Sequence, residues 1–172
     1  AKAIAFIRRY LDDLGFIVRL AQELVEQGTV DGARMYVAGF SNGGFMTQLL
    51  ACQAPHVFAA FASVGAAGFG GQPSACGPPR RTALLFVHGT HDAVGPWEGF
   101  RQQTPQGPVT VLASVAQTMT FWAERLGCSL EARTTLLPSL ARNPTTRTQV
   151  SEFLGCPAGA ELQLVAVQGG GD

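Results

Sequence analysis

MYVAGFSNGGFMTQLL, residues 35–50, is the stretch that decides the fold of this chain. Its residues 36–38 form a short apolar run, which is typical of a strand buried on both faces of a sheet. After Ser41 the apolar residues recur at helical spacing, at Phe45, Met46, Leu49 and Leu50. The stretch therefore predicts a strand, a glycine-pinched turn that carries one serine, and a helix.

The turn Gly39-Phe40-Ser41-Asn42-Gly43 fits G-x-S-x-G, the pattern of a nucleophile elbow. A sharp turn between strand and helix lifts the serine hydroxyl clear of the sheet, and glycines at both ends avoid a collision of side chains. The amide N–H of Asn42, at the start of the helix, points toward a developing oxyanion. We interpret Ser41 as a nucleophile. The alternative is a glycine-rich turn with an incidental serine.

A second group of candidate site residues follows the apolar run TALLFV, residues 82–87. This run predicts a strand that delivers His88 and Asp92 at its carboxyl end, the edge where parallel sheets place their sites. We interpret Asp92 as the carboxylate that orients an imidazole base, with a turn-capping aspartate as the alternative. We interpret His88 as a packing or hydrogen-bonding residue.

Periodicity along the chain predicts strands that alternate with helices, and hence a mostly parallel sheet. The sequence shows no repeat and no second domain, so we expect one domain over residues 1–172. The expected helices cover residues 11–27, 42–53 and 114–126, the expected strands cover 34–40, 57–64, 82–87 and 162–167, and residues 132–137 and 146–153 are expected to form a hairpin.

Three segments resemble the secreted serine esterases, a family of polyhydroxybutyrate depolymerases, feruloyl esterases and acetylxylan esterases. VDGARMYVAGFSNGG, residues 30–44, is similar to V-D-x-x-R-V-Y-V-x-G-x-S-N-G-G, and DDLGFI, residues 12–17, is similar to D-D-V-G-F-I. HGTHDAVGPW, residues 88–97, resembles H-G-T-x-D-x-x-V-P-Y. The resemblance runs from about residue 11 to the C-terminus. It implies an α/β-hydrolase fold, here partial because the early strands are missing.

The resemblance also implies a reaction, which is hydrolysis of a small or polymeric carboxylic ester through an acyl-enzyme on Ser41. Asp92 would then orient the base, and the Asn42 N–H would hold the oxyanion. Phe40 and Trp97 would line the acyl pocket. The family uses no metal and no organic cofactor, so we expect none. The acyl and alcohol groups stay open.

The chain departs from the family pattern at the base. The family histidine sits in G-G-G-H-x-W-P after the last strand, where this chain reads VQGGGD, residues 167–172. His56, His88 and His91 all precede Asp92, whereas the base of an α/β-hydrolase follows its acid. We expect a piece truncated at both ends that lacks the catalytic histidine and the second oxyanion donor, and is inactive alone. A terminal Asp172 carboxylate is too weak a base.

The four cysteines allow three pairings, or four reduced core thiols. The resemblance implies the pairs Cys52–Cys76 and Cys128–Cys156. Disulfides would place the protein in an oxidising compartment, so we expect secretion, with the bacterial periplasm as a further possibility.

Composition argues against several classes of partner. Lys plus Arg and Asp plus Glu both number 12, so the formal net charge is zero. Binding to nucleic acid needs a basic face, and we expect no such partner. The apolar runs are too short for a membrane span, so we expect no membrane partner.

Two other functions stay open at this point. An α/β-hydrolase-type serine peptidase would use the same elbow, because ester and amide cleavage share their apparatus. A catalytically degenerate binding protein on the same fold would explain the absent histidine. Fold alone does not decide between these functions.

Overall fold

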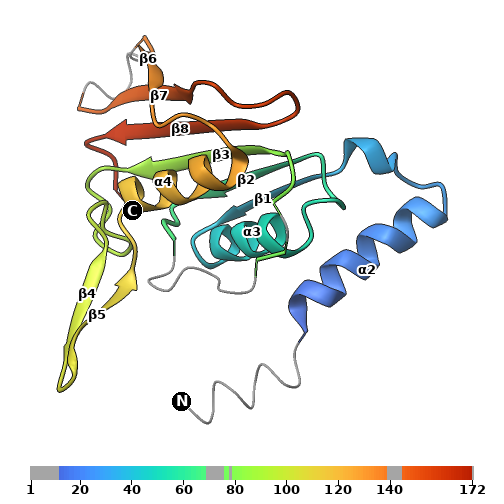
Figure 1. The fold of residues 1–172 in the computed structure, drawn as a ribbon, viewed down its shortest axis with the longest axis horizontal. Helices are drawn as coiled ribbons and strands as arrows, with labels where there is room; N and C mark the ends of the chain where they lie inside the picture. Colours follow the sequence, from blue (N-terminus) through green and yellow to red (C-terminus); the bar gives the residue numbers. More distant parts are fainter. Residues whose placement is uncertain (1–11, 69–75, 78, 139–144, 172) are drawn as a thin grey trace.

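A six-stranded sheet forms the centre of the molecule, in the order β1-β2-β3-β8-β7-β6 (Figure 1). The computed structural model describes residues 12–68, 76–77, 79–138 and 145–171. Parallel pairing joins β1 (Tyr36–Phe40), β2 (Ala60–Val64), β3 (Ala83–Gly89) and β8 (Glu161–Gln168). The mostly parallel sheet with flanking helices is confirmed. Each parallel strand begins and ends within three residues of its predicted bounds, and residues 57–59 of the second predicted strand lie outside it, in the connection before β2.

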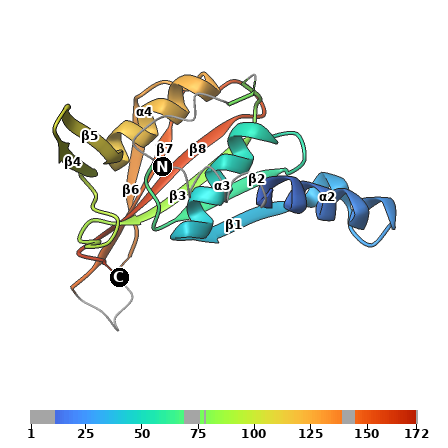
Figure 2. The same cartoon turned by 90° about the horizontal axis from the view of Figure 1, so that it is seen from below.

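Two helices, α3 (Asn42–Gln53) and α4 (Val115–Leu126), cover the same face of the sheet (Figure 2). Ser63 of β2 points at α3, because its hydroxyl donates to the Gly44 carbonyl. Phe86 of β3 shares the face of Ser63 and contacts the Trp122 ring of α4. The chain moves in one direction from β1 to β8, so crossovers of one hand put both helices on one side.

The opposite face of β1 is exposed in the part of the chain that the structure describes. Tyr36 and Phe40 are 67% and 64% exposed, and Ala38 between them is exposed as well. The prediction that residues 36–38 are buried on both faces is therefore wrong for this structure. Only the face that carries Val37 and Gly39 packs against α3, because no described helix covers the other side.

The core lies between the sheet and α3 and α4. Trp122, Leu50 and Leu162 are its largest fully buried side chains. The buried stripe of α3 includes Thr47 and Gln48, whereas Phe45, Met46 and Leu49 of the predicted apolar stripe are only partly buried. Burial of polar side chains requires hydrogen-bond partners, and both of these residues have them.

Helix ends follow the sequence closely. The helix α2 (Asp13–Glu26) begins after Asp12, whose carboxylate accepts from the Gly15 N–H, and Gly28 follows it with a φ of +68°. Ser114 caps α4 with a reciprocal Gln117 bond. Between α2 and β1 lies the short 3₁₀ helix η1 (Gly32–Arg34), so the first strand begins two residues later than expected.

Two antiparallel hairpins complete the fold. β6 (Ala132–Leu136) and β7 (Arg147–Phe153) form the predicted hairpin, and β7 pairs with β8, so the hairpin extends the sheet, which was not predicted. The second hairpin, β4 (Phe100–Thr104) and β5 (Gly107–Leu112), was not predicted, since its alternation of apolar and polar residues is weak. We call Phe100–Leu112 the ribbon. It extends away from the sheet (Figure 1).

Both expected disulfides form. Cys52–Cys76 joins the last turn of α3 to the segment before β3, and Cys128–Cys156 joins the end of α4 to the segment before β8. The described residues contain no free cysteine. No described helix has the length and apolar character needed to cross a membrane.

Candidate active site

Ser41 has an unusual backbone conformation at the carboxyl end of β1. Its φ is 52° and its ψ is −116°, and it is the only described residue other than glycine with a positive φ. Its N–H donates to the Val64 carbonyl of the neighbouring strand, which holds the turn to the sheet. Strained conformations of this kind cost about 1–3 kcal/mol and cluster at functional sites. Ser41 is exposed, and its side chain makes no capping bond to α3.

The structure supports the predicted steric role of Gly39 but not that of Gly43. A Cβ at Gly39 would lie 2.1 Å from the Gly43 carbonyl oxygen and 2.8 Å from Thr47 Oγ1, so Gly39 is needed for the turn. A Cβ at Gly43 would meet no described atom within 4 Å, so the predicted collision at Gly43 is not found. Gly44 instead packs closely, since its Cβ would lie 2.7 Å from Ala66 Cβ and 3.0 Å from the Val64 oxygen.

A buried polar network holds the first turn of α3 to the loop after β2. Gln48 Nε2 donates to Ser63 Oγ at 3.1 Å and to the Ala66 carbonyl at 3.0 Å. Ser63 Oγ lies 3.1 Å from the Gly44 carbonyl, to which it donates. Buried networks with satisfied partners rigidify their surroundings. This one fixes the start of α3, the helix that carries the Asn42 N–H in its first turn.

Asp92 is buried in the loop that follows β3, with 7% of its surface exposed. Its Oδ1 accepts from the backbone N–H groups of Val94 and Gly95, at 2.9 and 2.7 Å. Two backbone donors on one oxygen fix the orientation of the carboxylate. Asp92 does cap a turn, as the structural alternative expected, and it also presents Oδ2 to the interior of the site.

His88 lies beside Asp92 but makes its hydrogen bond elsewhere. It is 3% exposed, and its Nε2 donates to the Gly95 carbonyl at 2.7 Å. A carbonyl only accepts, so the proton sits on Nε2. The distance from Nε2 to Asp92 Oδ2 is 3.6 Å, which is too long for a hydrogen bond. The His88 ring also packs edge-on against Trp97, with ring centroids 6.0 Å apart.

Ser41 and Asp92 lie on the same edge of the sheet. Phe40 pairs with Val64 and Val64 pairs with Val87, and β3 continues two residues further to Gly89. One strand separates β1 from β3, so their backbones lie about 10 Å apart at this edge. The sheet topology places both residues at the carboxyl edge, as predicted.

The segment after β8 passes directly beside Asp92. The His91 N–H donates to the Gly170 carbonyl at 2.8 Å, and the Thr90 N–H donates to the Val167 carbonyl. A Cβ at Gly171 would lie 2.6 Å from the His91 oxygen and 3.6 Å from the Asp92 nitrogen. Gly171 therefore lies against the His91–Asp92 peptide. Asp172 lies outside the described residues.

The other two histidines are not placed to bridge Ser41 and Asp92. His56 precedes β2 and so lies toward the opposite edge of the sheet. His91 is exposed, and its Nδ1 lies 3.1 Å from Thr90 Oγ1. The described residues contain no group of three or more side chains suited to hold a metal ion.

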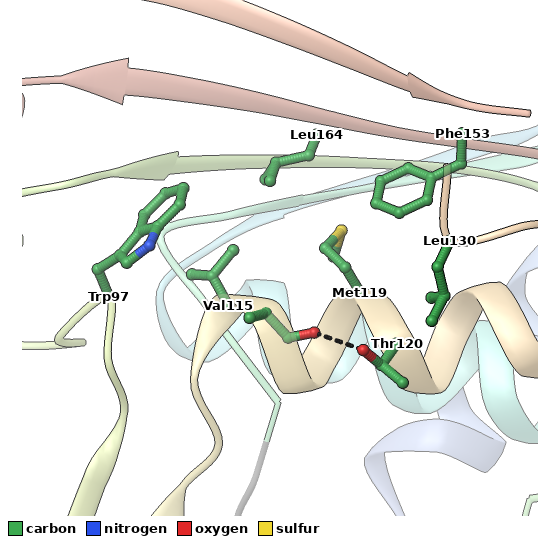
Figure 3. A pocket seen from close by; sticks show the side chains of 8 residues that line it. Trp97, Val115, Met119, Thr120, Leu130, Phe153 and Leu164 are labelled. Atoms are coloured by element: carbon green, nitrogen blue, oxygen red, sulfur yellow. Dashed lines mark hydrogen bonds between the residues drawn. The ribbon is translucent and has the colours of Figure 1, made fainter. Parts of the chain in front are cut away.

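An apolar cavity of about 300 Å³ lies between α4 and the strands β7 and β8 (Figure 3). Trp97 stands at one end and Phe153 at the other, while Met119 of α4 faces Leu164 of β8. Trp97 lines this cavity, and its ring also contacts His88. Its role in an acyl pocket stays a prediction. Phe40 does not line it. Its ring lies on the exposed face of β1, where a Cβ at Gly65 would touch it.

Sequence reasoning missed the Gln48–Ser63 network and the role of Gly44. One signal was available: Thr47 and Gln48 interrupt an otherwise apolar helix that had to be buried. A buried glutamine needs partners, and a serine in the neighbouring apolar strand is the natural candidate.

Comparison with known proteins finds one matching family model and two curated relatives. Residues 12–68 match the model of the prolyl oligopeptidase family. Feruloyl esterase B of Piromyces equi is 29% identical over 93% of this chain and 28% of its own length. A putative esterase, NocK, of Nocardia uniformis subsp. tsuyamanensis is 28% identical over 92% of this chain and 47% of its own length. The chain thus spans less than half the length of these curated relatives.

A solved structure shares the fold. The acetyl xylan esterase from Aspergillus awamori aligns with a TM-score of 0.54 at 16% identity, over 92% of this chain and 61% of the other. At this identity the likeness concerns the fold alone.

Proposed function

We propose that this chain, which has an α/β-hydrolase fold and resembles esterases, carries the nucleophile and acid of a serine carboxylic-ester hydrolase. The observation that carries this proposal is the exposed, positive-φ Ser41 on the same sheet edge as the buried Asp92. The two esterase relatives support the ester as substrate. Feruloyl, acetyl and hydroxybutyrate esters are all compatible with these two residues.

In the proposed reaction the Ser41 Oγ attacks the ester carbonyl carbon, and its proton passes to an imidazole. The tetrahedral oxyanion accepts a hydrogen bond from the Asn42 N–H. The leaving alcohol takes the proton back from the imidazolium as the carbon–oxygen bond breaks. Water then hydrolyses the acyl-enzyme by the same route.

We further propose that the imidazole comes from a histidine other than His56, His88 and His91. Asp92 Oδ1 is held by two N–H groups, which leaves Oδ2 to orient that ring. The backbone at Gly171 runs along the His91–Asp92 peptide, so a histidine entering there would face the acid. In subtilisin, loss of the catalytic histidine costs about 10⁶-fold in kcat, so we expect this chain alone to be inactive.

Imidazole rescue tests the proposal on the chain as it exists. Hydrolysis of p-nitrophenyl acetate is measured with and without added imidazole, for the unaltered chain and for Ser41→Ala and Asp92→Asn. We expect Ser41-dependent hydrolysis only with imidazole, and less of it in Asp92→Asn. Intact-mass spectrometry should detect one acetyl group on Ser41.

Two outcomes would contradict the proposal. Equal rates for the unaltered chain and Ser41→Ala at every imidazole concentration would remove Ser41 as nucleophile. Ordinary enzymatic turnover without imidazole would show that the chain has its own base.

A peptidase is the second candidate, because residues 12–68 match the prolyl oligopeptidase family model. That match covers the helix–strand–elbow unit, which amide and ester cleavage share. A p-nitroanilide of a short peptide, offered under the same rescue conditions, separates the two functions. We expect the ester to be cleaved and the anilide to survive. A binding protein without catalysis would leave both intact.

The two disulfides support secretion as part of the proposal. Cys52–Cys76 and Cys128–Cys156 persist only in an oxidising compartment. Thiol titration of protein from culture medium and from cell lysate tests the location.

A further inference from the structure

His88 is a polar side chain at the end of a row of buried apolar ones. Leu84, Phe86 and His88 alternate along β3, so they share the face of the sheet that the helices cover, and each is 3% exposed or less. An apolar side chain would continue this row without the cost of burying ring nitrogens. A histidine at this position therefore calls for a role that its polar atoms perform.

The Nε2–H of His88 attaches the loop of the proposed acid to the sheet. It donates to the Gly95 carbonyl at 2.7 Å. Gly95 is also held at its N–H, which donates to Asp92 Oδ1 at 2.7 Å. Among the residues that the structure describes, no other hydrogen bond joins residues 92–95 to a strand of the sheet. His88 thus sets the position of one of the two N–H donors that hold the Asp92 carboxylate.

His88 does not itself bond the acid. Its Nε2 lies 3.6 Å from Asp92 Oδ2, and its Nε2 proton is directed to Gly95 instead. The Trp97 indole packs edge-on against the His88 ring and helps to keep it in this orientation. Within the described part of the chain, Asp92 Oδ2 accepts no hydrogen bond, so this oxygen is available to a base.

We propose that His88 is a positioning residue: through Gly95 it fixes the Asp92 carboxylate so that Oδ2 faces the base. Its consequence for catalysis rests on the proposed function, whereas the attachment of the loop can be tested alone. Without the His88 donor, the loop loses its hydrogen bond to the sheet, and the carboxylate samples other orientations. A turned carboxylate no longer aligns its hydrogen bond with an imidazole, and misalignment of this kind lowers the rate.

Two substitutions separate the hydrogen bond of His88 from its packing. His88→Gln places an amide N–H near the position of the ring Nε2–H, whereas His88→Phe keeps a ring against Trp97 and removes the donor. His91→Phe is the matched control. His91 is an exposed histidine next to Asp92 in sequence, and its Nδ1 lies beside Thr90 Oγ1.

Amide hydrogen exchange of Val94 and Gly95 tests the attachment without any catalytic step. Both N–H groups donate to Asp92, so their exchange reports on the order of this loop. We expect them to exchange at least about tenfold faster in His88→Phe than in the unaltered chain, and within about threefold of it in His88→Gln and His91→Phe. Unchanged exchange in α3, together with circular dichroism, confirms that the variants fold.

Imidazole rescue tests the catalytic consequence through a double-mutant cycle with Asp92→Asn. If His88 acts through Asp92, His88→Phe should lower the rescued rate of the unaltered chain about tenfold and have no further effect on Asp92→Asn. A general loss of structure would instead lower both rates by the same factor. His88→Gln should restore most of the rate.

Several outcomes would overturn the inference: unchanged exchange of Val94 and Gly95 in His88→Phe, equal losses in both backgrounds of the cycle, a loss in His88→Gln as large as in His88→Phe, or the same changes in His91→Phe. Rescue of the unaltered chain that His88→Phe leaves intact refutes only this inference. No rescue of the unaltered chain refutes the proposed function, and the exchange rates alone then decide whether His88 holds the loop.

Discussion

The elbow and the ribbon lie on the same side of the molecule but are built in opposite ways. At the elbow, β1 and α3 approach so closely that a Cβ at Gly39 would overlap the Gly43 carbonyl. In the ribbon, a Cβ at Gly107 would meet no described atom within 4 Å. The elbow is fixed by packing and by buried hydrogen bonds, whereas the ribbon is fixed only at its base.

This difference suggests a division of tasks between the two regions. The elbow must hold the Ser41 hydroxyl and the Asn42 N–H in one geometry, since small displacements cost large factors in rate. The ribbon is fixed only at its base and has no catalytic geometry to hold. Substitutions should therefore affect stability strongly at the elbow and weakly in the ribbon.

The largest effect is expected for Gly39→Ala. The added Cβ would lie 2.1 Å from the Gly43 oxygen and 2.3 Å from its carbon, both of them backbone atoms that cannot rotate away. We expect a loss of at least about 3 kcal/mol in the free energy of unfolding, measured by urea denaturation. Gly43→Ala is the matched control, and since nothing described lies within 4 Å, it should be neutral or stabilising by up to about 1 kcal/mol. Equal losses in both variants would refute the packing explanation.

Removal of the disulfide at the far end of α3 is expected to rank second. Cys52–Cys76 closes a loop with a sequence separation of 24, and Cys52 at the end of α3 is fully buried. In the chain-entropy model, Cys52→Ala/Cys76→Ala should cost about 3 kcal/mol. Urea denaturation of the variant and of the unaltered chain, both kept oxidised, measures this cost. A change below about 1 kcal/mol would contradict it.

The elbow was predictable because local chemistry fixes it. Gly39, Ser41 and the apolar run before them specify strand, turn and helix within ten residues, and the structure begins α3 at the predicted residue. The position of Asp92 followed from one further rule, that parallel strands place their sites at their carboxyl ends. The disulfide pairs followed from the family resemblance and not from the spacing of the cysteines.

The remaining features depend on contacts between distant residues. The Gln48–Ser63 bond joins residues 15 apart, and its existence depends on how α3 lies on β2. The exposed face of Tyr36 depends on what covers the sheet, which an apolar pattern does not reveal. In the ribbon, residues 100–112 alternate too irregularly for a strand pattern, partly because of the bulge between Phe100 and Arg101.

Loss of the buried network behind the elbow is expected to lower the free energy of unfolding by less than loss of the disulfide does, but by more than a substitution in the ribbon. Gln48→Leu removes two hydrogen bonds and leaves the Ala66 carbonyl with one fewer donor, which should cost about 2 kcal/mol. Gln53→Leu is the control, because Gln53 lies on the same helix and is exposed. Urea denaturation measures both, and imidazole rescue should weaken only in Gln48→Leu. A network that only fills space would tolerate leucine without loss.

The smallest effect is expected in the ribbon, where Val109→Thr should change the free energy of unfolding by less than about 0.5 kcal/mol. Val109 is half exposed, and threonine keeps a β-branched side chain that suits a strand. Amide hydrogen exchange sharpens the comparison, because local opening should leave the ribbon N–H groups far less protected than those of β1 and α3. Ribbon amides as protected as those of β1 would mean that both regions unfold together, and the contrast between them would be lost.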